Sequence, residues 1–273
     1  VDLEYNICLT HGNGPQVGDE LYRMELTHEI IPPLPLGVCV AETQGSIGYM
    51  VQQSLQNVLK EKKIDREVVT LITQTIVDKN DPSINDPQKF IGRRYGKTEA
   101  QSLARQFNWT IKEQEPGKWR QVVPSPMPQF IEHGRSIQTL VDNGTIVIAS
   151  GGGGIPTFWN DDHKLEGLNA VIDKDLSAAL LGRVIKSEEL WIITDLDQVC
   201  LNFGKSNEQP LLKITLDEAQ KYFDEGHFQE GSMGPKIRAA MYFLKHHGKK
   251  VIITSIAGVL GAINGSNGTT ITK

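Results

Sequence analysis

Residues 145–154 read TIVIASGGGG, and this stretch decides the fold class of the chain. Its first six residues are almost continuously apolar, which is typical of a strand buried on both faces of a parallel sheet. Four glycines, Gly151, Gly152, Gly153 and Gly154, follow at once. Glycine at the carboxyl end of a parallel strand lets backbone N–H groups approach and bind an anion. The stretch therefore predicts an α/β fold with an anion site at this strand end.

Working outward from this segment, short apolar runs alternate with helical patterns. We expect further strands at residues 5–10, 67–77, 189–194 and 250–254. Helices are expected at residues 16–30, 46–60, 98–106, 129–142, 173–184, 216–225 and 235–247. Such alternation predicts a mostly parallel, open sheet with helices on both faces.

Residues 78–123 interrupt this alternation. They begin with the turn pairs Asp81-Pro82 and Asp86-Pro87, then predict a short helix and a hairpin of residues 109–112 and 119–123. We interpret 78–123 as a small protruding subdomain inserted into a core of residues 1–77 and 124–273. The alternative is a surface excursion without function.

Composition limits the classes of partner. With 273 residues, 39% hydrophobic and 22% charged, the chain is long enough for one large domain. A net charge of -5 does not favour nucleic-acid or polybasic membrane binding, so cations that bind anions must be placed locally. The three cysteines show no CxxC spacing, and no signal peptide or apolar run of membrane-spanning length is visible in the sequence. These features predict a cytoplasmic protein without a disulfide framework or zinc site.

A second glycine-rich turn, HGNGPQ at residues 11–16, lies between the expected strand 5–10 and a helix. Its candidate phosphate-binding residues are Gly12, Asn13 and Gly14. Neither turn matches GxxxxGK[ST] or GxGxxG, and each alone could be a tight turn. Two such turns at equivalent places in one sheet favour phosphate contact. For His11, fixing the turn is favoured over acting as a general base.

Two lysines stand at expected helix starts. Lys174 lies between Asp173 and Asp175, which either pair with a solvated ammonium or orient it toward a transferred phosphoryl group. Lys236 closes the motif GSMGPK, where Pro235 is expected at the first helical position. A cation in a first helical turn costs about 0.3–1 kcal/mol unless an anion binds there.

Polar residues also end the strand expected at 189–194. Thr194, Asp195 and Asp197 would lie on the ligand side of a parallel sheet, where they could bind magnesium, a ribose hydroxyl or a lysine. Capping a turn is the alternative. The following residues 198–203 and Gly204-Lys205 resemble a hairpin that could wall an adenine site.

Taken together, the motifs resemble carbamate kinases of the amino-acid-kinase superfamily over essentially the whole chain. The matching segments are residues 11–18, Gln44-Gly45 with 47–49, 124–126, 151–156, 171–175 and 231–236. The resemblance implies a three-layer αβα sandwich, a homodimer, and ATP or ADP with Mg²⁺ carried by the nucleotide. It also implies the reversible reaction of ATP with carbamate to give ADP and carbamoyl phosphate, used to make ATP in arginine catabolism.

The same resemblance assigns roles to residues. Lys174 and Lys236 stabilise the phosphoryl group, Lys236 also contacts the nucleotide, Asp173 organises the lysines, and Lys89 reaches the site from the subdomain. The chain has Arg93-Arg94-Tyr95 where the family has Pro-Phe-Tyr. Kinases for acetylglutamate or aspartate, and an inactive nucleotide-binding homologue, remain alternatives.

Two further expectations concern a segment before residue 1 and a dimer interface. The chain starts without methionine, and carbamate kinases place a strand, a Gly-Gly-Asn loop and a helix before its first expected strand; we expect such a segment in the natural protein. An apolar stripe on the helix at 46–60 predicts a dimer interface, with packing on the core as the alternative. Its members are Ile47, Met50, Val51, Leu55, Val58 and Leu59.

Overall fold

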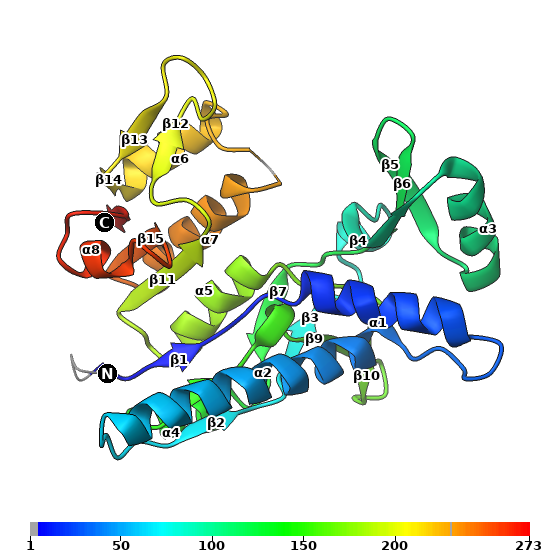
Figure 1. The fold of residues 1–273 in the computed structure, drawn as a ribbon, viewed down its shortest axis with the longest axis horizontal. Helices are drawn as coiled ribbons and strands as arrows, with labels where there is room; N and C mark the ends of the chain where they lie inside the picture. The colour runs from blue at the N-terminus through cyan, green and yellow to red at the C-terminus, as the bar shows by residue number, and fades with distance from the viewer. Residues whose placement is uncertain (1–4, 230) are drawn as a thin grey trace. The chain divides into compact units, whose positions relative to one another are not determined.

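The computed structural model describes residues 5–229 and 231–273, and the chain divides into two compact units, Val1–Lys174 and Asp175–Lys273. Both units combine sheets with helices (Figure 1). Parallel pairing predominates outside the subdomain of residues 78–123, as the sequence predicted.

The first unit contains two sheets besides that of the subdomain. One has the order β1 (Cys8–Leu9), β8 (Ile146–Ile148), β2 (Val68–Thr70), and all its strands are parallel. The other has the order β10 (Leu165–Gly167), β9 (Ile155–Trp159), β3 (Gln74–Val77), β7 (Pro128–Ile131), with antiparallel strands at both edges.

The single strand expected at residues 67–77 is wrong, because β2 and β3 belong to different sheets. The chain crosses from one sheet to the other at residues 71–73. Leu71 N still bonds Ile148 O beside β8, whereas Thr73 O already accepts from Ile155 N of β9. A segment rich in the strand-favouring residues Val, Ile and Thr therefore contains a change of partner strand.

Helices α1 (Gly14–Thr27), α2 (Leu36–Glu61) and α4 (Gly134–Asp142) cover the first unit. α2 starts ten residues before the expected 46, directly after Pro35. The helix expected from residue 129 is also wrong at its start, because residues 128–131 form β7. Burial along β7 does not alternate, because Pro128 and Ile131 are buried while the two residues between them are exposed, and its pairing with β3 shifts register between Ile76 and Val77. His133, at φ 60, then breaks the backbone direction before α4.

The predicted subdomain elements are present. An antiparallel sheet orders β4 (Lys89–Tyr95), β6 (Lys118–Val123) and β5 (Thr110–Glu115), with α3 (Lys97–Phe107) packed against it and a 3₁₀ turn at Pro82–Ile84. The hairpin turns at Gly117, whose φ of +75° suits glycine. The expected hairpin and helix are confirmed.

Residues Arg93 and Tyr95 of β4 contact α1. The Tyr95 hydroxyl donates to both carboxylate oxygens of Glu25, at 2.8 and 2.7 Å. The Arg93 guanidinium lies 3.9 Å from the centre of the Tyr22 ring, a cation–π contact. Burial raises the pKa of Glu25, although the Tyr95 hydrogen bond opposes this shift. Arg93 and Tyr95 thus supply polar and aromatic contacts between the subdomain and α1.

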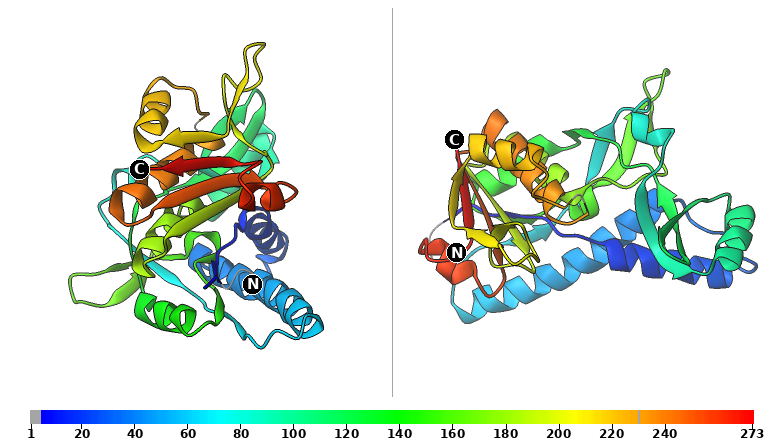
Figure 2. Two further views of the ribbon diagram at one scale, coloured as in Figure 1. Left: turned by 90° about the vertical axis from the view of Figure 1, so that its left-hand side faces the viewer. Right: turned by 90° about the horizontal axis from the view of Figure 1, so that it is seen from above.

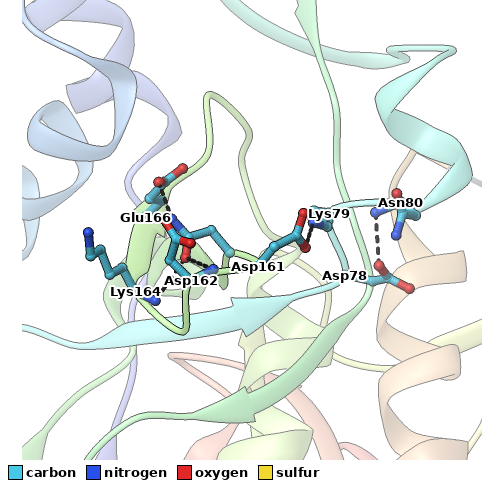
Figure 3. Close-up of polar contacts among 8 residues, drawn as sticks. Asp78, Lys79, Asn80, Asp161, Asp162, Lys164 and Glu166 are labelled. Carbon is cyan, nitrogen blue, oxygen red and sulfur yellow. Dashed lines mark hydrogen bonds and ion pairs between the residues drawn. The ribbon is translucent and has the colours of Figure 1, made fainter.

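Where the chain enters the subdomain, ionic contacts tie it to its neighbours. The Asp81 carboxylate accepts from Ser83 N and from Met127 N, so it joins the entering and leaving segments. Lys79 Nζ lies 2.5 Å from Asp161 Oδ1 in the turn between β9 and β10 (Figure 3). Asn160 shapes that turn by accepting from the backbone N–H groups of residues 162 and 164.

The second unit is built on the sheet β11 (Glu189–Thr194), β15 (Lys250–Ser255), β16 (Thr269–Thr272), β14 (Lys213–Thr215). β11 and β15 are parallel over six residue pairs, and β16 runs antiparallel to β15. Its helices are α5 (Lys174–Val184), α6 (Leu216–Asp224), α7 (Met233–His246) and α8 (Val259–Ile263), and β12 (Val199–Leu201) and β13 (Gln209–Leu211) form the expected hairpin (Figure 2).

The core of this unit lies between α7 and the sheet. Phe243, Ile237 and Ile253 are fully buried there, together with Ile271. Burial of such side chains stabilises a fold by about 1.5–3 kcal/mol each. The expected helices α5, α6 and α7 agree with the structure within two residues at each end. Among the described residues, no helix is both long and apolar enough to cross a membrane.

Candidate active site

The two glycine-rich turns meet in the first unit. They follow β1 and β8, which are adjacent and parallel, with Cys8 opposite Val147 and Leu9 opposite Ile148. Gly152 N donates to His11 O at 2.7 Å, so the turns are joined by their backbones. The sequence expectation that both turns lie at equivalent strand ends is confirmed.

Glycine is required in the second turn by both conformation and space. Gly152, Gly153 and Gly154 all have positive φ, of +64°, +94° and +88°. A Cβ on Gly153 would lie 2.7 Å from Ile172 O, and a Cβ on Gly152 would overlap the Asn13 amide. Side chains are therefore excluded, and the main chain itself lines this turn.

Polar side chains of the first turn are used to hold its shape. His11 Nδ1 lies 2.9 Å from Gly12 O, and its Nε2 faces the Cα of Gly151. Asn13 Nδ2 donates to Thr43 Oγ1 of α2 at 2.9 Å. These contacts support a structural role for His11 rather than that of a general base. Gly14 is exposed as the first residue of α1.

Three of the predicted charged residues lie together beside these turns. Lys89 Nζ is 3.2 Å from Asp173 Oδ2, although the two residues are 84 positions apart. The Lys174 side chain passes over Gly12, with its Cδ 3.2 Å from where a Cβ on that glycine would stand. Two ammonium groups suit a polyanionic ligand such as a phosphoryl group. The N–H groups of Gly152, Gly153 and Gly154 instead donate to His11 O, Ser150 O and Gly151 O, so they hold the shape of the turn.

The second unit holds the other predicted lysine. Lys236 Nζ lies 3.5 Å from Asp175 Oδ2, and the two side chains are only 14% and 10% exposed. Lys236 is the fourth residue of α7, and Pro235 is the third residue, not the first as expected. Asp175, weighed in the sequence only as a neighbour of Lys174, is thus the carboxylate that contacts Lys236. The sequence carries no distinguishing signal for this contact, because an acid in a first helical turn is ordinary and the burial of Asp175 is seen only in the structure.

The end of β11 presents the predicted polar residues. Thr194 Oγ1 donates to Asp195 Oδ1 at 2.9 Å. This bond, its own backbone N–H and the charge of Lys236 lower the pKa of Asp195, against a small effect of burial. Asp197 accepts from Ser255 Oγ at the end of β15. An ionised Asp195 is available for a hydroxyl or a nucleotide-bound cation, while Asp197 holds the two strand ends together.

The amino acid kinase family model matches residues 1–255 of this sequence. The chain belongs to this family. It is 44% identical to the carbamate kinase of Pyrococcus horikoshii over 270 residues, covering 98% of this chain and 86% of the relative. It is also 44% identical to the carbamate kinase-like protein YahI of Escherichia coli, over 99% of the chain and 86% of that protein.

A solved structure gives the same result. The carbamate kinase of Giardia lamblia bound to AMP-PNP matches this family member with a TM-score of 0.92 and 41% identity, over 100% of the chain and 86% of that structure. The resemblance inferred from the motifs and the fold class it implied are therefore confirmed.

Proposed function

We propose that the chain is a carbamate kinase, which transfers a phosphoryl group reversibly between ATP and carbamate. The observation that carries the proposal is the gathering of Lys89, Asp173 and Lys174 beside two joined glycine turns. Carbamoyl phosphate is an acyl phosphate, so the reaction can make ATP, and we place it in cytoplasmic arginine catabolism. The relatives at 44% identity support the assignment.

The mechanism needs positioning and charge, and no covalent intermediate. The phosphoryl group passes through a loose transition state with negative charge on its equatorial oxygens. Lys174 of the first unit and Lys236 of the second would each help to stabilise that charge, as would the N–H groups of residues 12–14 and 151, while residues 152–154 shape the turn. Preorganised donors of this kind contribute about 3–4 kcal/mol each. Asp173 would hold the ammonium group of Lys89, and Asp175 would hold that of Lys236.

The nucleotide requires a second set of contacts. We assign Thr194, Asp195, Asp197 and Lys236 to ATP or ADP, with the β12–β13 hairpin as a wall for adenine. Within residues 5–229 and 231–273 no group of three or more His, Cys, Asp or Glu side chains could hold a metal. Mg²⁺ with one carboxylate and the nucleotide phosphates fits this arrangement, with Asp195 as the available ligand. When bound, Mg²⁺ would neutralise charge on the transferred phosphate.

Acceptor identity is tested by product formation. Purified protein is incubated with ATP in three separate reactions, which contain carbamate, acetylglutamate or aspartate. We expect ADP release with carbamate alone. Turnover with acetylglutamate or aspartate would replace the proposed acceptor, and nucleotide binding without turnover on any acceptor would indicate an inactive homologue.

We further propose that residues 78–123 are a mobile lid that brings Lys89 to the transferred group. Lids exclude water from phosphoryl transfer. Lys89→Ala should then impair turnover of carbamoyl phosphate much more than binding of ADP, measured by steady-state kinetics and calorimetry. Lys112→Ala is the matched control, since Lys112 pairs with Asp86 in the same subdomain. An equal loss of turnover and ADP binding in Lys89→Ala would place Lys89 outside the acceptor site.

A homodimer through α2 is the last part of the proposal. Along the predicted stripe, Leu59 is buried, whereas Met50 and Val58 are 55% and 47% exposed, as is the neighbouring Tyr49 at 63%. A two-fold interface needs such a self-complementary apolar patch.

Introducing glutamate at Met50 and Val58 together should therefore produce monomers in light scattering. Ile30→Glu, a substitution at an 85% exposed position beyond α1, should leave the mass unchanged. A dimer that survives both α2 substitutions would remove this helix from the interface.

A further inference from the structure

We infer that Gln44 is a positioning residue for the reaction: through Thr73, it holds the Gly151–Gly154 turn in its anion-binding shape. The kinetic part of this inference rests on the proposed function, in which that turn binds the transferred phosphate. Gln44 touches no reacting group in this account and acts only through the backbone it fixes.

Gln44 is an amide buried inside the first unit. It lies on α2, and only 1% of it is exposed. Burying an amide without hydrogen bonds is costly, so both of its polar atoms need partners. Gln44 Oε1 accepts from Thr73 N at 2.7 Å, and Gln44 Nε2 donates to Thr73 O at 3.2 Å. One side chain thus satisfies both backbone polar groups of a residue 29 positions away.

Thr73 accepts hydrogen bonds from the residues at both ends of the glycine turn. Before the turn, Ser150 N donates to Thr73 Oγ1 at 2.9 Å. After the turn, Ile155 N donates to Thr73 O at 2.9 Å. Ser150 adopts the left-handed backbone conformation at φ 56, which a serine does not favour without such support.

Gln44 also touches the turn directly. A Cβ on Gly151 would lie 3.1 Å from Gln44 Cγ, so the side chain packs under the first glycine. Thr75, the next buried threonine, donates from Oγ1 to Gly153 O at 2.9 Å. Gln44, Thr73 and Thr75 therefore form a buried polar layer against the turn, and their hydrogen bonds fix the backbone of residues 150–155.

If residue 44 served only to fill space in the core, an apolar residue of similar size would be expected there instead of glutamine. Methionine would fill a similar volume without polar atoms to satisfy, and methionine swaps for residues of like size are generally tolerated in cores. The paired hydrogen bonds instead fix α2 and residue 73 in one register, which an apolar side chain cannot do. Small displacements of this kind at a catalytic turn cost up to about 100-fold in rate.

The test compares Gln44→Met with Gln52→Met. Gln52 lies on the same helix and accepts from Thr70 Oγ1 at 2.9 Å, so its replacement also removes a hydrogen bond, one made to the last residue of β2 and not to Thr73. Gln44→Met should lower kcat with carbamoyl phosphate about 10- to 100-fold and leave the KM for ADP unchanged. Gln52→Met should behave as the unsubstituted enzyme.

Hydrogen exchange separates this inference from the proposed function. Peptides covering residues 150–155 should exchange faster in Gln44→Met than in Gln52→Met, whether or not the protein turns over carbamoyl phosphate. An inactive unsubstituted protein would count against the proposed function, and exchange would then decide alone whether Gln44 holds the turn.

Unchanged exchange, or faster exchange with normal kcat in an active enzyme, would overturn the positioning role. If Gln44→Met does not fold, the inference is tested by comparing Thr73→Val with Thr73→Ser. Valine removes the hydroxyl that accepts from Ser150 N, whereas serine keeps it. We expect the valine variant alone to lose activity and protection of residues 150–155; equal behaviour of both variants would overturn the inference.

Discussion

Replacing Lys174 or Lys236 with alanine should lower kcat at least about 100-fold while leaving the fold intact. Lys174 crosses Gly12 of the first glycine turn, and Lys236 forms a largely buried pair with Asp175. The Lys236 ammonium is thus held by Asp175 before substrate binds, and the aliphatic part of the Lys174 side chain is placed against the first glycine turn. Preorganised charge of this kind acts mainly on the transition state, so the loss should appear in kcat more than in KM.

The measurement is steady-state kinetics in both directions, with circular dichroism to confirm folding. Lys245→Ala is the matched control for Lys236, because Lys245 lies on the same helix and bonds only Gln220 among the contacts described for its ammonium. It should keep full activity. Near-normal kcat in both Lys174→Ala and Lys236→Ala would refute their assignment to the phosphoryl site.

Gly153→Ala should destabilise the fold by about 2–5 kcal/mol, as the sum of a left-handed backbone and a steric clash. The φ of +94° is unfavourable for alanine, and the new Cβ would stand 2.7 Å from the carbonyl oxygen of Ile172. That carbonyl directly precedes Asp173 in the chain. Relief of the clash would move the turn or residues 172–173, so kcat should also fall.

Gly144→Ala isolates the backbone contribution. Gly144 has a similar φ of +84°, but a Cβ there would meet nothing within 4 Å. This control should lose only about 1–2 kcal/mol and keep its activity. Urea denaturation of both variants gives the comparison, and equal losses of stability would show that the Ile172 contact does not constrain the turn.

Local pattern was enough to predict most elements, and it failed where tertiary partners decide. The helices at α5, α6 and α7 have their own apolar periodicity, and their bounds were predicted closely. Residues 67–77 look like one strand because their threonines favour strands as the valines and isoleucines do, and no glycine or proline marks the change from one sheet to the other at 71–73. Residues 129–131 were assigned to a helix because three residues are too few to show which period applies.

The same distinction applies to the candidate site. The glycine turns and the lysines were visible because their residue types are unusual at strand ends and helix starts. The pairing of Lys89 with Asp173 across 84 residues was expected only in outline, and the pairing of Lys236 with Asp175 across 61 was not expected. Gln44 and Thr73 carried no local signal, since a buried glutamine is recognised only when the backbone it bonds is known.

The most direct test of the central claim is ATP formation from ADP and carbamoyl phosphate by the purified full-length protein. Luciferase detection follows ATP over time, with Lys174→Ala as the control for contaminating kinases. The account predicts ATP formation that depends on carbamoyl phosphate and falls at least about 100-fold in the Lys174→Ala protein. Binding of ADP without ATP formation, or equal ATP formation by both proteins, would contradict it.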